Sequence, residues 1–235
     1  MVPAGKPVDD MLFGPDGLVH HLKRGDIIID GGNSFYKDTI LRAKRLAKKG
    51  IHLFDVGTSG GPRGALHGAC LMIGGNAKVF EELRPLFRDL SNGTAYQFFS
   101  GTGAGHFVKM VHNGIEYGMM QAIAEGFALL KKAHFKLDLT EVASIYNNGS
   151  VIESRLTKWL EKAFLEHGND LKAITGSVAQ TGEGAWTAAT AKALKIATPI
   201  IEGSVKFRKQ SEKKPSYTGK VLSALRGQFG GHATR

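Results

Sequence analysis

Short apolar runs and longer helical patterns alternate along the first hundred residues of the chain. The apolar runs predict β-strands over residues 26–30, 52–56, 71–73 and 94–98. Between them, apolar positions at helical spacing predict helices over 77–86 and over 39–49, the latter ending at Gly50 as its C-cap. Strands that alternate with helices are typical of an α/β sheet with crossover connections.

After residue 99 the strand pattern stops, and helical periodicity continues to the end of the chain. The predicted helices cover residues 104–132, 139–146, 154–163, 187–196, 199–209 and 218–228. The glycine-rich segment 101–105 lies between the two patterns. We therefore predict two domains, an α/β domain over 1–100 and an all-helical domain over 101–235.

The α/β part begins too late for a complete dinucleotide-binding sheet. Such a sheet opens with a strand, a G-x-G-x-x-G loop and a helix, and the start of this chain has none of them. Residues 2–5 are predicted as the end of a strand and its turn, followed by a helix that opens at 8–10. The glycines of 101–105 lack the fingerprint spacing. We expect a partial Rossmann-type sheet whose first half is missing from the chain.

Glycine-rich loops follow the first two predicted strands, at residues 31–34 and 58–61. In open α/β sheets the loops at the carboxyl ends of the strands line the ligand crevice. Glycine lets a ligand approach the backbone closely, and Asn33 and Ser59 supply hydrogen bonds. Tight turns that bind no ligand are the equal alternative for both loops.

Four chemically active side chains share one stripe of the helix predicted over 104–132. Lys109, His112, Asn113 and Glu116 stand at helical spacing, within an arc of roughly 100° at ~100° per residue. Such a stripe is normally apolar, so polar groups there need water, partners or a substrate. The neighbouring residues are apolar, as in a helix built for burial: Phe107, Val108, Met110, Val111 and Ile115.

Composition and charge narrow the classes of partner. The chain has 235 residues, 42% of them hydrophobic and 22% charged, as in an ordinary globular protein. Its net charge of +10 suggests an anionic partner, which nucleic acid, a membrane surface or a phosphorylated metabolite would each provide. The basic residues are scattered without interleaved aromatics, so we predict no nucleic-acid partner. One basic group is interpreted as a solvated helix face: Arg42, Lys44, Arg45, Lys48 and Lys49.

The single cysteine and the hydropathy indicate the compartment. Cys70 excludes an intrachain disulfide framework, fits the reducing cytoplasm and is expected to be a small buried hydrophobe in the run 70–73. No run approaches the ~18 apolar residues that span a bilayer, and the start lacks a signal-peptide pattern. We predict a soluble cytoplasmic protein with no membrane partner.

Motifs along nearly the whole chain match one known family in order. They are IDGGNS at 29–34, DVGTSGG at 55–61, LMIGG at 71–75, GHFVKMVHNGIEY at 105–117, GSVI at 149–152 and FGGH at 229–232. Together they resemble the decarboxylating 6-phosphogluconate dehydrogenases, in the short bacterial form whose helical domain is not duplicated. The resemblance implies oxidation of 6-phosphogluconate at C3 by NAD or NADP, with NAD slightly favoured, then loss of carbon dioxide and formation of ribulose 5-phosphate in the pentose phosphate pathway.

The resemblance also implies a role for each residue of the stripe. Lys109 is the general base for the C3 hydroxyl, so its pKa has to fall from ~10.4 toward ~7–8 through burial and nearby cations. Glu116 is the acid that protonates C1 of the enediol. His112 and Asn113 orient the substrate's carboxylate and hydroxyls.

Further contacts are implied outside the stripe. The polyol site is completed by Asn33, Ser59, Gly60 and Gly61. The substrate phosphate is held by Tyr117, Arg226 and His232, the last two from a partner subunit, so the helical domain is expected to form a homodimer or higher homo-oligomer. The cofactor-binding residues are Val2, Ala4 and Asn33, and no metal site is implied.

Two positions depart from the family pattern. Ala185 stands where the family has a basic residue before the tryptophan, and Glu212 aligns with an arginine before the last helix. Each lost charge-assisted hydrogen bond weakens phosphate binding by ~1.5–3 kcal/mol. A small shift of register would let one of four nearby cations compensate: Lys206, Arg208, Lys213 or Lys214.

Two alternatives to this function remain open. One is a truncated, non-catalytic relative that dimerises, which the missing fingerprint, Ala185 and Glu212 favour. The other is a β-hydroxyacid dehydrogenase that acts on another acid, for which Lys109 and Asn113 suffice and Glu116 is not required.

Overall fold

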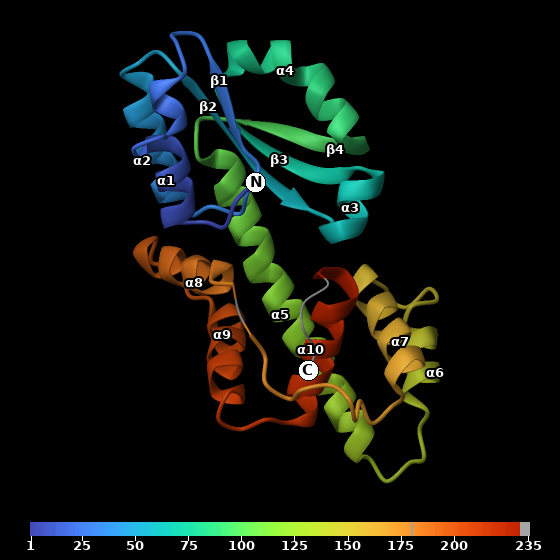
Figure 1. The fold of residues 1–235 in the computed structure, drawn as a ribbon. Coiled ribbons are helices and arrows are strands. Elements are labelled where there is room, and N and C mark those ends of the chain that lie inside the picture. Colours follow the sequence, from blue (N-terminus) through green and yellow to red (C-terminus); the bar gives the residue numbers. More distant parts are fainter. Residues whose placement is uncertain (180, 231–235) are drawn as a thin grey trace. The chain divides into compact units, whose positions relative to one another are not determined.

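The structure is a computed structural model that describes residues 1–179 and 181–230 (Figure 1). The chain forms two compact units, Met1–Asn113 and Gly114–Arg235. The division falls inside a long helix, α5 (Ala104–Lys132). The functional domain boundary after residue 100 stays a prediction.

The first unit contains a mixed four-stranded sheet. The strands lie in the order β1 (Ile27–Asp30), β2 (His52–Ser59), β3 (Ala69–Gly75) and β4 (Ser91–Ser100). β1 pairs parallel with β2, and β3 pairs parallel with β4, whereas β2 and β3 are antiparallel. The helical segments of this unit are α1 (Lys6–Phe13), the 3-10 turn η1 (Leu18–His20), α2 (Tyr36–Ala47), α3 (Gly61–His67), α4 (Ala77–Leu90) and the start of α5.

Alternation along β2 sends its side chains to two different faces. Phe54 packs in one hydrophobic cluster with Phe87 of α4. Leu53 packs on the opposite face with Leu46 of α2. Within this unit, α4 covers one side of the sheet, and α1 and α2 cover the other (Figure 1). Asp55 lies on the same face of β2 as Leu53, two residues along the strand. The predicted α/β class is confirmed by this sheet with helices on both sides.

Three local predictions in the first unit were wrong. α3 forms where only a glycine-rich loop was predicted, and β2 and β3 are antiparallel instead of joined by a crossover. The segment 60–68 is shorter than the dozen or more residues that a parallel crossover needs, so α3 returns the chain along the same sheet. Residues 2–5, predicted as the end of a strand and its turn, lie outside any strand.

Two burial predictions were also wrong. Cys70 is exposed, because Ala69 and Leu71 take the buried positions in the alternation of β3. Arg42 is only 3% exposed, since it lies on the buried stripe of α2 with Leu46. The other members of the predicted solvated face are exposed as expected: Lys44, Arg45, Lys48 and Lys49.

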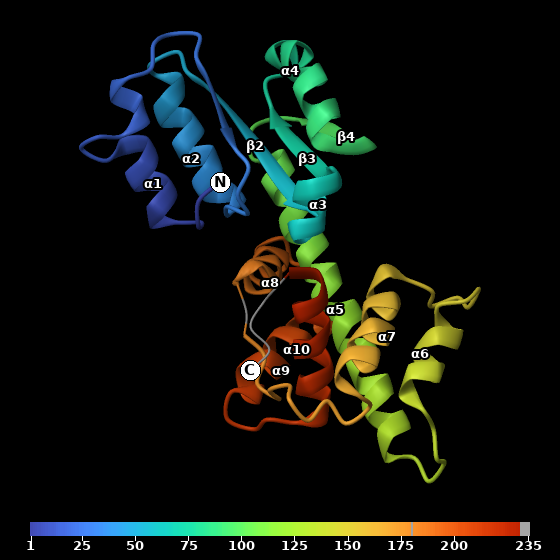
Figure 2. The same ribbon diagram turned by 45° about the vertical axis from the view of Figure 1, so that its right-hand side comes forward.

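The secondary structure of the second unit consists of helices joined by loops, with no strand among its described residues (Figure 2). The end of α5 is followed by α6 (Leu139–Tyr146), α7 (Arg155–His167), α8 (Glu183–Ala193), α9 (Pro199–Ser211) and α10 (Tyr217–Gly230). Asp138 caps α6 by accepting from the Thr140 N–H, and Ser154 caps α7 by accepting from the Thr157 N–H. One apolar core joins α5, α6, α7 and α10, and Phe207 of α9 packs against it; its members include Met120, Phe127, Leu160, Phe164, Leu222 and Leu225. The predicted all-helical part is thus confirmed.

Hydropathy along the helices gives one further result. Across residues 1–179 and 181–230, no helix combines the length and the apolar character needed to cross a membrane.

Candidate active site

Asp55 and two glycines anchor the N-terminus of α5 on the sheet. Asp55 is fully buried, and its carboxylate accepts hydrogen bonds from the backbone N–H groups of Gly103 (2.6 Å) and His106 (2.8 Å). A carboxylate at this end of a helix satisfies free N–H groups and interacts favourably with the helix dipole. The backbones approach closely, since a Cβ on Gly105 would lie 2.5 Å from the carbonyl oxygen of Asp55, and one on Gly74 would lie 2.6 Å from the Gly105 nitrogen.

Lys109 lies against β2 one turn further along α5. A Cβ on Gly57 would lie only 2.3 Å from the Cβ of Lys109, so the lysine stem packs directly on the strand backbone. The side chain is 5% exposed, and its Nζ donates a hydrogen bond to Asn113 Oδ1 at 2.7 Å. A lysine in such a place is close to the sheet surface but keeps its amine among polar groups.

His112 links this amine to the carboxyl end of β2. Its Nδ1 lies 2.9 Å from Asn113 Oδ1 and 3.4 Å from Lys109 Nζ, and its Nε2 lies 3.4 Å from the hydroxyl of Ser59. Burial lowers the pKa of His112, and the charge of Lys109 lowers it further, against the opposing effect of the Asn113 hydrogen bond. The structure therefore brings together four predicted site residues, Lys109, His112, Asn113 and Ser59.

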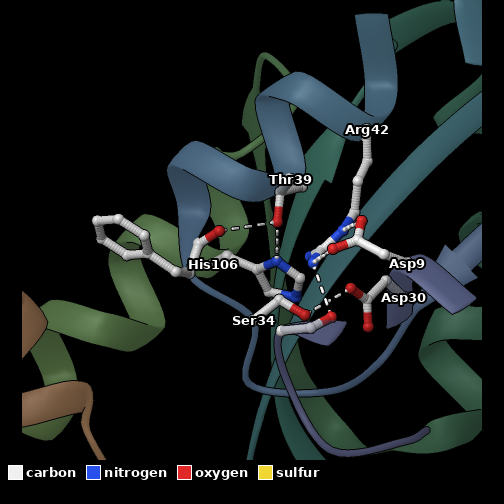
Figure 3. Close-up of polar contacts among 8 residues, drawn as sticks. Asp9, Asp30, Ser34, Thr39, Arg42 and His106 are labelled. Carbon is white, nitrogen blue, oxygen red and sulfur yellow. Dashed lines mark hydrogen bonds and ion pairs between the residues drawn. The ribbon is translucent and has the colours of Figure 1, made fainter. Parts of the chain in front are cut away.

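Asp30 shapes the loop that follows β1. Its carboxylate accepts hydrogen bonds from the Gly32 N–H (3.0 Å) and from the Ser34 hydroxyl (2.7 Å; Figure 3). Asn33 Oδ1 is buried and has no hydrogen-bond partner among the described residues. The carbonyl oxygen of Val2 lies 3.1 Å from where a Cβ on Gly32 would stand, so Val2 is beside this loop.

Polar contacts also connect α2 with α1 and with α5 (Figure 3). Arg42 donates from Nε to Asp9 Oδ1 (2.9 Å) and from Nη2 to both Asp9 Oδ2 (3.1 Å) and the carbonyl of Gly5 (3.0 Å). The hydrogen bond from Arg42 lowers the pKa of Asp9. His106 Nδ1 lies 2.8 Å from the hydroxyl of Thr39. These contacts hold the turn that contains the predicted cofactor residue Ala4, directly before Gly5.

In the second unit, a buried arginine lies over a tyrosine ring. Arg208 is 2% exposed, and its guanidinium carbon lies 3.4 Å from the ring centroid of Tyr117. Among the described residues its only hydrogen-bond acceptor is the sulfur of Met120, at 3.9 Å, and its Nε has no partner there. Burial lowers the pKa of Arg208 to about 10. A buried guanidinium without a carboxylate partner is costly in a core and is typical of an anion site.

Other charged groups surround this arginine. Arg226 on α10 is 7% exposed, and burial is the main cause that lowers its pKa, against the opposing charges of Tyr117, Glu116 and Glu183. Glu183, the first residue of α8, is 7% exposed, and its Oε2 has no hydrogen-bond partner among the described residues. Tyr117 is buried, and its hydroxyl likewise has no described partner.

The remaining predicted residues are placed as follows. Gly60 and Gly61 lie between the end of β2 and the start of α3. Glu212 is exposed at the C-cap of α9, and Ala185 is half-buried in α8. Arg226 is buried beside charged groups of its own unit, and its predicted contribution to a partner's site stays a prediction. His232 lies outside the described residues.

Sequence reasoning missed Glu183 and gave Arg208 only a compensating role. The burial of Arg208 had a signal, because Ser204, Arg208 and Ser211 recur at helical spacing on the buried side of α9. Glu183 gave no signal, since a carboxylate in the first turn of a helix is ordinary. Among the described residues, no group of His, Cys, Asp and Glu is suited to hold a metal ion.

Comparison with family models divides the chain into two parts. Residues 1–101 match the NAD binding domain of 6-phosphogluconate dehydrogenase, and residues 105–228 match the C-terminal domain of 6-phosphogluconate dehydrogenase. The first match confirms the predicted nicotinamide dinucleotide as the cofactor class, NAD or NADP.

Curated relatives extend the same similarity over the whole chain. A Bacillus subtilis protein whose name assigns it to 6-phosphogluconate dehydrogenases, YqeC, is 48% identical over 234 residues, which are all of this chain and 77% of that protein. The NAD(+)-dependent, decarboxylating 6-phosphogluconate dehydrogenase of Haloferax volcanii is 40% identical over 99% of this chain and 76% of its own length.

Solved structures agree with these relatives. The 6-phosphogluconate dehydrogenase of Plasmodium falciparum superposes with a TM-score of 0.77 and 27% identity, over 96% of this chain and 55% of that one. A 3-hydroxyisobutyrate dehydrogenase of Salmonella typhimurium shares the fold, with a TM-score of 0.71 and 22% identity over 94% of this chain and 76% of its own. The chain therefore belongs to the 6-phosphogluconate dehydrogenase family of oxidoreductases.

Proposed function

We propose that this chain catalyses the oxidative decarboxylation of 6-phosphogluconate to ribulose 5-phosphate, with reduction of NAD or NADP. The observation that supports this best is the hydrogen-bonded group of Lys109, Asn113, His112 and Ser59, which stands where β2 ends and α5 passes it. An amine, an amide, an imidazole and a hydroxyl in one group suit a polyhydroxy acid, because each can form hydrogen bonds with hydroxyl or carboxylate groups, and the amine and the imidazole can also exchange a proton.

Lys109 is assigned as the general base. Its Nζ accepts the proton of the C3 hydroxyl as the hydride leaves C3, and the resulting ammonium then donates a hydrogen bond to the new keto oxygen. Loss of carbon dioxide breaks the C1–C2 bond, whose electron pair forms the C2=C3 double bond while the carbonyl π pair moves onto the keto oxygen. That oxygen takes the proton of the Lys109 ammonium, which leaves an enediol and a neutral lysine. Burial of the stem on Gly57 supports this role, because low solvation favours a neutral amine.

Glu116 and the hydrogen-bonding residues complete the reaction. Glu116 donates a proton to C1 of the enediol, while Lys109 takes the proton of the enediol hydroxyl, so that the ketose forms. His112, with its lowered pKa, is a neutral hydrogen-bonding group at pH 7 and orients the substrate together with Asn113. Ser59, Gly60, Gly61 and Asn33 are assigned to the polyol hydroxyls.

The phosphate is assigned to the cations of the second unit. Arg208 and Arg226 are both buried and have no ion-pair partner among the described residues, so a bound anion would supply the missing compensation. The Tyr117 hydroxyl, buried and without a described partner, would donate a third hydrogen bond. In this assignment Arg208 replaces the cation that Glu212 does not provide, and His232 contributes from the last residues of the chain.

The loop after β1 fits one end of a nicotinamide dinucleotide. The buried oxygen of Asn33 has no described partner, and the close approach of Val2 to Gly32 leaves no side chain between them. Asn33, Val2 and Ala4 would hold the cofactor, which when bound supplies the hydride acceptor. Of the two cofactors, NAD is slightly favoured over NADP. The chain is assigned domains over 1–100 and 101–235, and it is proposed to form a homodimer or higher homo-oligomer in the cytoplasm.

A direct assay tests this function. We would incubate the purified chain with 6-phosphogluconate and either NAD or NADP, and record reduced nicotinamide together with released carbon dioxide. Lys109→Met should abolish both signals, and the exposed Lys158→Met should change neither. If the chain reduced cofactor with a different hydroxy acid but left 6-phosphogluconate untouched, or if Lys109→Met kept its rate, the proposal would be wrong.

A further inference from the structure

Glu183 is a buried carboxyl group in a site assigned to an anion. It is 7% exposed, and its Oε2 is buried without a hydrogen-bond partner among the described residues. Burying a polar oxygen without a partner costs about 1–3 kcal/mol, more if it is charged. A structural role does not explain this burial, because among the described residues no hydrogen-bond donor satisfies Oε2.

Packing places Glu183 next to the assigned phosphate site. The following residue, Gly184, lies so close to Tyr117 that a Cβ there would be 2.5 Å from the tyrosine ring carbons. Arg208 stacks over this same ring at 3.4 Å. α8 and α9, which carry Glu183 and Arg208, are also in direct contact. Glu183 therefore begins its helix beside the tyrosine that the arginine covers.

The charges around this ring do not balance with a phosphate dianion present. The cations are Arg208 on α9 and Arg226 on α10, and the carboxylates are Glu183 on α8 and Glu116 on α5. Two guanidinium groups would compensate a dianion alone. An ionised Glu183 would add to the negative charge of Glu116 and would face the phosphate in a region shielded from water, where repulsion is strong.

We propose that a phosphate monoester binds here together with one proton, which is shared between Glu183 and a phosphate oxygen. This inference rests on the proposed function, because it takes the same cations as the phosphate site. The proton turns the repulsive pair of oxygens into a hydrogen bond, and it gives Oε2 the partner it lacks. Glu183 is thus a specificity-determining residue, which selects an anion that can share a proton over one that cannot.

The proposal predicts a particular dependence on pH. A phosphate monoester has a second pKa of about 6, and a carboxyl group is ordinarily ionised at neutral pH, so above pH 7 the shared proton comes from solution. The dissociation constant should then rise about tenfold per pH unit between pH 7 and 9. Sulfate, which carries no proton in this range, should bind much more weakly than the phosphate monoester.

Calorimetry with glycerol 3-phosphate as the probe tests this directly. Titrations of the whole chain at pH 7, 8 and 9, in buffers of different ionisation enthalpy, give both affinity and protons taken up. The wild-type chain should take up about one proton per ligand, and Glu183→Gln should take up none and bind with an affinity that changes less than about twofold over this range. Glu183→Gln should also bind sulfate at least tenfold more tightly than the wild type.

Two controls separate the possible outcomes. Glu202→Gln removes the same charge from an exposed position of α9 and should keep the wild-type pH dependence. Arg208→Met should abolish binding of the probe, which locates it at this cluster. No proton uptake by a wild-type chain that binds the probe, or equal uptake by Glu183→Gln, overturns the role of Glu183 and leaves the phosphate assignment intact. If Arg208→Met still binds the probe, or if the wild-type chain does not bind it at all, both the role of Glu183 and the phosphate assignment are overturned.

Discussion

Replacing Arg208 by methionine should make the chain more stable while removing its anion site. The arginine is 2% exposed, and its only hydrogen-bond acceptor among the described residues is a thioether sulfur, so most of the lost hydration of its charge is not replaced. The lowering of its pKa by burial, to about 10, corresponds to roughly 3 kcal/mol, at 1.36 kcal/mol per pH unit. A methionine of similar length would fill the same space beside Met120 and Tyr117.

The stabilisation expected from Arg208→Met is reduced by one lost interaction. The stacking of the guanidinium over Tyr117 is worth about 2 kcal/mol when desolvated, so the net stabilisation of Arg208→Met should be about 1–2 kcal/mol. Because the folded-state pKa lies below the unfolded value, the folded chain binds fewer protons between about pH 10 and the unfolded-state pKa, and stability rises with pH only in that window. At pH 7 the penalty of the charge is therefore fully present.

Thermal and urea unfolding measure this effect. For a chain of this size, about 1–2 kcal/mol corresponds to a rise of roughly 2–8 °C in Tm. The control Arg155→Met, an exposed arginine that lies over Trp159, should shift stability by no more than about 0.5 kcal/mol. Glycerol 3-phosphate should stabilise the wild type and leave Arg208→Met unchanged. A lower Tm for Arg208→Met would refute the reasoning, since it would mean that stacking outweighs desolvation.

Three further predictions concern the first unit. Gly57→Ala should lower kcat by at least tenfold, because its new Cβ would stand 2.3 Å from that of Lys109. Circular dichroism should show an intact fold, and a wild-type kcat would argue against the close packing. Asp55→Ala should reduce the free energy of unfolding by about 2–4 kcal/mol, as two N–H groups lose their buried acceptor, and a loss below about 1 kcal/mol in urea unfolding would contradict this. The imidazole of His112 should titrate with a midpoint below pH 6.5 by NMR, and a midpoint above 6.5 would be inconsistent with its burial. The stability that it contributes should be present above pH 6.5 and be lost as the pH falls through its lowered folded-state pKa.

The elements that the sequence predicted well are those with strong local patterns. α5 and α6 have the bounds read from their periodicity, because a long apolar stripe between clear end signals leaves little choice. The direction of β3 was not predictable in the same way, since a strand has the same alternation whichever way it runs. Only the length of 60–68 carried that information, because it is too short for a crossover.

The candidate site was predictable where neighbours share one helix. Lys109, His112 and Asn113 interact because their spacing places them side by side on α5. Arg208 was harder to predict, because its importance depends on a tyrosine 91 positions earlier in the chain, and no local pattern encodes such a contact. The exposure of Cys70 followed from strand alternation, which the apolar character of 70–73 obscured.

The exposed thiol of Cys70 also makes the unaltered sequence suitable for spectroscopy. It is the chain's only cysteine and belongs to the first unit, whereas both tryptophans, Trp159 and Trp186, belong to the second. A fluorescent acceptor attached to this thiol would receive excitation energy from indoles of the other unit alone. Energy transfer would then report, without any engineered residue, how substrate and cofactor change the separation of the two units as each is added.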